Sequence, residues 1–177
     1  FNYLTTKIST KSFDELKSEF LNILRDTIQR LIKFANGRQI VVPLSGGYDS
    51  RLIASLLKQA NYQNVTCFTY GKKSSSEVVT SQKVANKLGF KWFFVEYNEQ
   101  SINQNFPQSN EFQKYYKFAS NHISIFLTQD YFAVKYLHEN KIINDDAIFV
   151  PGHTGDFLSG LHLDKAEIAN RDNIIDL

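Results

Sequence analysis

The chain has 177 residues, enough for one domain, and its 42% hydrophobic and 21% charged residues exclude wholesale disorder, collagen-like repeats and low complexity. Its 20 basic and 18 acidic residues leave a net charge of +2 without any block of five like charges, so no nucleic-acid-binding arm is predicted. The single cysteine, Cys67, excludes an intramolecular disulfide and a cysteine zinc site. Without a signal pattern or a stretch of roughly 18 apolar residues, we expect a cytoplasmic protein with no membrane or nucleic-acid partner.

The ends of the chain suggest a piece of a longer protein. It contains no methionine and begins at Phe1, and it stops at Leu177 without a clear closing element. We therefore expect residues 1–11 to be an N-terminal extension or linker and residues 12–177 to be one domain, truncated at its C-terminus.

The first predicted element is a long helix. Ser12 and Glu15 have capping-box spacing, apolar residues follow at intervals of three and four up to Ala35, and Asn36-Gly37 supplies a stop. A short apolar run, residues 39–44, then predicts a buried strand.

Helices and strands alternate through the rest of the chain. After a Gly-containing turn at residues 45–50, the patterns predict a helix (50–59), a strand (65–70), a helix (76–88), a strand (91–97), a surface loop (98–110), a helical region (111–140) with a break near Ser120, and a strand (147–151). A second Gly-rich turn follows at residues 152–160, with a possible helix from Phe157 onward.

This alternation favours an α/β fold with a parallel sheet covered by helices on both faces. Ligands of such sheets bind beyond the carboxyl ends of the strands. Because both Gly-bearing turns directly follow strands, we expect them to open on the same edge of the sheet.

The first turn, Ser45 to Ser50 (SGGYDS), has the composition of a phosphate-binding loop. Its two glycines let the backbone approach a ligand, its serine hydroxyls and amides donate to anionic oxygens, and the next helix begins there. Asp49 is suited to hold Mg²⁺ beside a phosphate. Neither a Walker A sequence nor G-x-G-x-x-G occurs.

With this loop the chain resembles the N-type ATP pyrophosphatases (the PP-loop superfamily), and among them the C-terminal domain of asparagine synthetases. The resemblance covers roughly residues 12–160, including CFTYG at 67–71, the helix start at 75–77 and VANKLG at 84–89. It implies an adenine nucleotide α-hydrolase-like three-layer sandwich that binds ATP and Mg²⁺. An acceptor carboxylate would be adenylated and then attacked by ammonia or an amine, supplied by a glutaminase domain outside this chain.

The resemblance also implies roles for particular residues. Ser45, Gly46, Gly47, Asp49 and Ser50 would contact the phosphates and the metal. Leu44 and Tyr70 would border the adenine and ribose. Pro43 and Phe68 would do so too, although Phe68 could equally be a residue of the hydrophobic core.

The second turn, PGHTGDF at 151–157, departs from the family pattern S-G-E-G-x-D-E. Gly152 and Asp156 match, so backbone contact with the nucleotide and a second carboxylate for Mg²⁺ or catalysis are expected. His153 replaces one glutamate and Phe157 the other. His153 could act as a general base or have a structural role, and the asparagine reaction itself is in doubt.

Several assignments stay open at this stage. Glu77 either lies near the pyrophosphate or complements a helix dipole. Arg51 either pairs with phosphates or the acceptor carboxylate, or forms a salt bridge with a helix acid. The chain is either an amide-forming ligase domain, with Asp49, Asp156 and His153 as catalytic residues, or a nucleotide-binding module that has lost this chemistry. A tRNA-thiolating or sulfate-reducing relative would want a reactive cysteine, which mid-strand Cys67 does not offer.

Overall fold

The computed structural model describes residues 10–105, 109–120 and 128–153. In this part of the chain four parallel strands form one sheet, in the order β3-β2-β1-β4. The strands are β1 (Ile40–Pro43), β2 (Val65–Gly71), β3 (Lys91–Glu96) and β4 (Ile148–Phe149). The helices are α1 (Phe13–Ala35), α2 (Tyr48–Gln59), α3 (Ser76–Leu88), α4 (Glu99–Asn105), α5 (Asn110–Ser120) and α6 (Asp130–Glu139).

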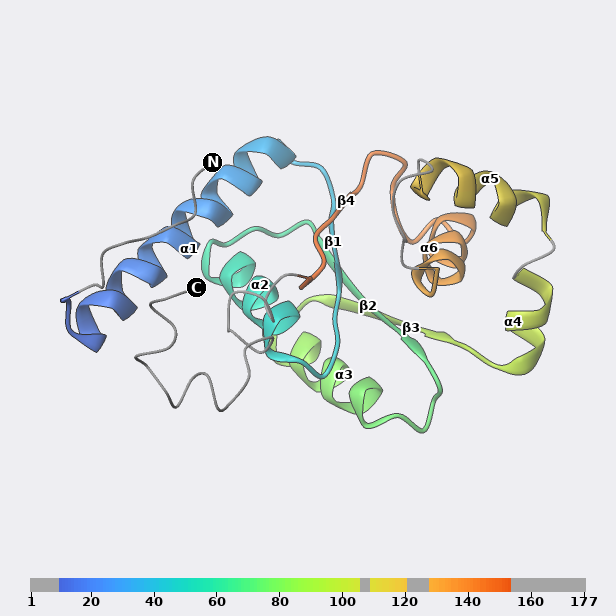
Figure 1. The fold of residues 1–177 in the computed structure, drawn as a ribbon, viewed down its shortest axis with the longest axis horizontal. Coiled ribbons are helices and arrows are strands. Elements are labelled where there is room, and N and C mark those ends of the chain that lie inside the picture. Colours follow the sequence, from blue (N-terminus) through green and yellow to red (C-terminus); the bar gives the residue numbers. More distant parts are fainter. Residues whose placement is uncertain (1–9, 106–108, 121–127, 154–177) are drawn as a thin grey trace, which may run out of the picture.

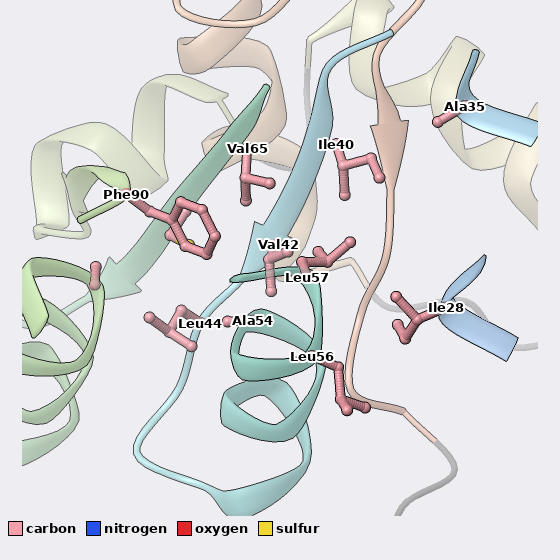
Figure 2. Packing of buried hydrophobic residues seen from close by; sticks show 12 residues of the cluster. Ile28, Ala35, Ile40, Val42, Leu44, Ala54, Leu56, Leu57, Val65 and Phe90 are labelled. Atoms are coloured by element: carbon pink, nitrogen blue, oxygen red, sulfur yellow. The ribbon is translucent and has the colours of Figure 1, made fainter. Parts of the chain in front are cut away.

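The helices cover both faces of the sheet, as the sequence predicted (Figure 1). Side chains alternate across β1, so that Ile40 and Val42 point to one face and Val41 to the other. The first face carries the larger cluster, in which Figure 2 shows Ala54 and Leu57 of α2 beside Val42. On the opposite face α6 packs against the sheet, through a cluster of Val41, Phe68, Val95, Ala133, Leu137 and Ile143.

The capping box predicted at the start of α1 is present. The amide of Glu15 donates to the hydroxyl oxygen of Ser12 at 3.3 Å, and the Glu15 carboxylate accepts from the Ser12 amide at 2.8 Å. The helix ends at Asn36, whose backbone is left-handed. Only the second half of α1 packs on the sheet, since Phe13, at 78% exposure, and Ile23, at 60%, remain in solvent.

A buried glutamine joins the first strand to the segment that leads into the last one. The side-chain amide of Gln39 donates to Thr66 Oγ1 at 2.8 Å and to the carbonyl of Ile142 at 3.1 Å, and its Oε1 accepts from the Asn144 amide at 2.8 Å. These bonds satisfy the polar atoms of a side chain that is 6% exposed. They hold β4 beside β1, and the second Gly-bearing turn follows β4.

Two expectations need correction. Residues 98–110 were expected to form a loop, but α4 occupies Glu99–Asn105. Asn98 and Ser101 start this helix by exchanging side-chain and backbone hydrogen bonds of 2.8 and 3.0 Å. Furthermore, α2 begins at Tyr48, two residues earlier than predicted. None of the helices in the described ranges is both long and apolar enough to cross a membrane.

Candidate functional site

A pocket of about 500 Å³ lies where β1 and β2 end and where the chain leaves β4. The carboxyl ends of parallel strands are where ligands bind in sheets of this kind. The pocket wall includes residues from both Gly-bearing turns, from α3 and from the start of α6: Pro43, Leu44, Ser45, Gly47, Asp49, Ser50, Phe68, Thr69, Tyr70, Glu77, Gln129, Asp130, Pro151, Gly152 and His153.

The loop between β1 and α2 is organised by its own serines. The Ser45 amide donates to Ser50 Oγ at 3.1 Å, and the two hydroxyl oxygens lie 3.1 Å apart. The Gly47 amide donates to Ser45 Oγ at 3.1 Å. The serines thus bond within the loop and fix its shape. The N-cap residue of α2, Gly47, has no side chain to cap the helix, which leaves first-turn amides available to an anion.

The Arg51 side chain forms hydrogen bonds with the backbone of this loop. Its Nε donates to the Gly47 carbonyl and an Nη to the Gly46 carbonyl, both at 2.8 Å. The guanidinium carbon lies 4.4 Å from the centroid of the Tyr48 ring. Neither earlier expectation for Arg51, a phosphate or a helix acid as its partner, describes these contacts. By holding two consecutive carbonyls, Arg51 limits the orientations open to the peptide groups of the loop.

The two Gly-bearing turns pack against each other, so the prediction that they open on one edge is confirmed. A Cβ added to Gly152 would lie 2.7 Å from the Ser50 nitrogen, which is closer than real Cβ atoms approach backbone. At Gly46 a Cβ would lie 3.3 Å from the Glu77 Cγ. Glycine is therefore required for close packing at position 152, and Gly46 brings the loop against the first turn of α3.

A buried network fixes the end of β1, and sequence reasoning missed it. Thr69 Oγ1 donates to the Leu44 carbonyl at 2.6 Å and lies 2.7 Å from Ser81 Oγ, while Trp92 Nε1 donates to Thr69 Oγ1 at 3.0 Å. Leu44 directly follows β1, and the other three residues come from β2, α3 and β3. No single segment carries a signal for such a network, because each residue is unremarkable in its own element.

The pocket wall is acidic. Asp49, Glu77 and Asp130 contribute carboxylates, and no lysine or arginine is among the described residues that line the pocket. Asp49 is half-buried in the first turn of α2, whereas Glu77 is exposed at the start of α3. A polyanionic ligand here would need a cation to offset three carboxylates, and hard carboxylate oxygens suit Mg²⁺ that also takes phosphate oxygens.

Tyr70 lies on the pocket wall, as predicted, but its hydroxyl already has a partner. It donates to the carboxylate of Asp130, and its ring stacks on Tyr97 at a centroid distance of 5.0 Å. Burial raises the pKa of the Tyr70 hydroxyl well above its usual value, and hydrogen bonding to Asp130 raises it further. The hydroxyl is therefore a neutral donor at physiological pH.

The other predicted site residues divide into three groups. Leu44 lies at the pocket with a buried side chain, Gly152 packs behind Ser50, and His153 is exposed on the wall. Phe68 is fully buried in the core and also lines the pocket. Asp156, the expected second carboxylate, lies outside the described residues, and within them no three His, Cys, Asp or Glu side chains gather as a metal cluster.

Comparison with known proteins places residues 20–132 in the family described as Asparagine synthase. An NH₃-dependent NAD⁺ synthetase of Mesoplasma florum is 35% identical over 86 residues, which are 48% of this chain and 35% of that protein. The tRNA-specific 2-thiouridylase MnmA of Campylobacter lari is 37% identical over 70 residues, 37% of this chain and 21% of that protein. The aligned segments thus cover about a third and a fifth of these relatives.

Among solved structures, an NH₃-dependent NAD synthetase from Campylobacter jejuni, in complex with the nitrate ion, has a TM-score of 0.49. It is 16% identical, and the match covers 81% of this chain and 59% of that chain.

Proposed function

Because the chain belongs to the asparagine synthase family, within the PP-loop superfamily, we propose that its pocket binds ATP and Mg²⁺ for the adenylation of a carboxylate. The observation that carries the proposal is the loop at residues 45–50, which joins the end of β1 to the uncapped start of α2 inside a 500 Å³ pocket. The pocket size suits a small-molecule ligand.

The residues present fit the phosphates. Amides at the uncapped start of α2 would donate to phosphate oxygens, and the shape of the loop before them is fixed by the Ser45–Ser50 contacts and by Arg51. Gly152 allows the second turn to approach this loop at a distance that a side chain would prevent. In our proposal Ser45, Gly46, Gly47 and Ser50 hold the pyrophosphate part, and Leu44, Tyr70 and Gly152 border the rest of the nucleotide.

Asp49 would hold Mg²⁺ beside the phosphates, with Asp156 as a second ligand. The bound metal would neutralise charge on the pyrophosphate. This fits a wall that carries three carboxylates and no described basic side chain. Asp49 is half-buried in the first turn of α2, on the wall of the pocket.

The proposed reaction is amide formation in two steps. The acceptor carboxylate attacks the α-phosphorus of ATP and pyrophosphate leaves, after which ammonia or an amine displaces AMP and gives up a proton. Asparagine synthetase-like specificity is the finer part of this proposal. His153 is exposed on the pocket wall, and in this proposal its imidazole receives that proton. A glutaminase domain outside this chain would supply the ammonia.

A second candidate is a module that binds the nucleotide without amide-forming chemistry. The observation in its favour is the second turn, where His153 stands in place of the family's glutamate.

Pyrophosphate release by the full-length protein separates the two candidates. The assay supplies ATP, Mg²⁺, ammonium and a panel of carboxylic acids, with the Asp49→Asn variant beside the wild type and Asp26→Asn, an exposed position on α1, as the matched control. The ligase proposal predicts carboxylate-dependent release that falls at least a hundredfold in Asp49→Asn alone. ATP binding with no release for any acid would contradict it and favour the binding module.

A further inference from the structure

Asp130 is a carboxylate of the pocket wall that the proposed roles do not use. It is the first residue of α6, it is half-buried, and it accepts a hydrogen bond from the Tyr70 hydroxyl. Among the described residues, no lysine or arginine lines the pocket beside Asp130.

Contacts of Tyr70 and Tyr97 fix the position of the Asp130 carboxylate. Tyr70 stacks on Tyr97 with an interplanar angle of 24°. The Tyr97 hydroxyl donates to the Gln129 carbonyl at 2.5 Å and accepts from the Ala133 amide at 3.0 Å. The first turn of α6 is thereby joined to the ends of β2 and β3, and Asp130 has little freedom to move away from the pocket.

The direction of the Tyr70 hydrogen bond fixes what Asp130 can still recognise. An ionised carboxylate only accepts hydrogen bonds, and its two oxygens offer about four sites. Tyr70 remains a neutral donor and occupies one of them. The remaining sites suit N–H donors and disfavour a carbonyl oxygen, which would be repelled.

We propose that Asp130, oriented by Tyr70, accepts a hydrogen bond from an amino group of the ligand bound in this pocket. The inference rests on the proposed function, which supplies two such groups. One is the exocyclic amine of the adenine ring, and the other is the ammonium group of an acceptor that is an amino acid. Asp130 is then a specificity-determining residue, because it discriminates an amino group from a carbonyl oxygen or a hydrogen atom at the same place.

Calorimetric titration of the full-length protein in Mg²⁺ tests the first source. Adenosine triphosphate is compared with inosine triphosphate, which carries a carbonyl oxygen in place of the amine. If Asp130 reads the base, the wild type binds ATP at least tenfold more tightly than the inosine nucleotide, and Asp130→Asn reduces this ratio to below threefold. Tyr70→Phe, which keeps the ring stack, reduces the ratio partially.

Pyrophosphate release tests the second source. Aspartate is compared with succinate, which lacks the ammonium group, and the readout is the ratio of their KM values. If Asp130 reads the acceptor, the wild type prefers aspartate at least tenfold and Asp130→Asn loses this preference at unchanged ATP affinity. The exposed Asp145→Asn serves as the control in both assays, and unfolding temperatures verify that each variant is folded.

The two proposals fail in different ways. Equal discrimination by the wild type and Asp130→Asn in both assays, or no discrimination by the wild type in either, would overturn the role of Asp130 while leaving ATP binding intact. A wild-type protein that does not bind ATP in the presence of Mg²⁺ would overturn the proposed function and this inference together.

Discussion

At the scale of single residues, the shape of the loop at residues 45–50 depends on Arg51 as well as on its own glycines and serines. The guanidinium bonds the carbonyls of Gly46 and Gly47 and lies over Tyr48, whose ring is 83% exposed. These contacts stiffen the loop before any ligand arrives. Preorganisation of this kind reduces the entropy lost on binding.

We expect Arg51→Ala to weaken ATP affinity about tenfold, or about 1.4 kcal/mol, because two hydrogen bonds to the loop are lost. Calorimetric titration measures the effect. Arg51→Lys should recover only part of the affinity, since an ammonium group does not reproduce the planar fork of the guanidinium. Arg30→Ala, on the exposed side of α1, is the matched control. An Arg51→Ala protein with wild-type affinity would show that these contacts do not prepare the loop for its ligand.

The sequence predicted the positions of the pocket residues better than their contacts. Ser45, Asp49 and Tyr70 lie on the pocket wall because each stands at the carboxyl end of a strand or in the turn after it. The contacts of Arg51 with the loop carbonyls were not predicted, because a side chain of that length has several partners within reach and sequence does not choose among them. Asp130 went unnoticed because it reaches the pocket from α6, about 80 residues after the loop in the chain.

At the scale of elements, local signals predicted helices well where capping and periodicity agreed. The capping box of α1 lies where it was expected, and α3 has its predicted bounds, ending at Leu88 before a left-handed Gly89. In contrast, α4 was missed because Ile102 is its single aliphatic residue, so apolar periodicity is absent. The Asn98–Ser101 cap was the signal available for it.

We expect Ser12→Ala to destabilise the start of α1 by about 1 kcal/mol, because the hydroxyl oxygen that accepts from the Glu15 amide is lost. The first half of the helix is largely exposed, so fraying should stay local. Amide hydrogen exchange would then accelerate about fivefold over residues 16–24 and remain unchanged in α2. Ser18→Ala, at an exposed position of the same helix, should not accelerate exchange. Unaltered exchange in Ser12→Ala would refute this role of the cap.

At the scale of the whole molecule, the sheet supports the site. Cys67 lies buried in this sheet, so the accessibility of its thiol measures whether the sheet is intact. The Cys67 side chain is fully buried in β2, and burial raises the pKa of its thiol to about 12. The native thiol is therefore protonated and enclosed, in agreement with the expectation that it is not a reactive cysteine.

We expect a disulfide reagent at pH 8 to label Cys67 at least a hundredfold more slowly in the native protein than in guanidinium-unfolded protein. Because the native pKa is raised, the unfolded thiol ionises first, and the free energy of unfolding should decline as the pH rises from about 8.5 towards 12. Equal labelling rates in the two states would mean that β2 is not enclosed as described.

The central claim is that the loop at residues 45–50 and Asp49 bind the magnesium-bound phosphates of ATP. Calorimetric titration of the protein with ATP tests it most directly, with excess Mg²⁺ in one experiment and with a chelator in the other. We expect saturable binding that requires Mg²⁺ and is lost in Asp49→Ala but kept in Asp26→Asn. Binding of equal affinity in the wild type and Asp49→Ala, or no binding by the wild type, would contradict it.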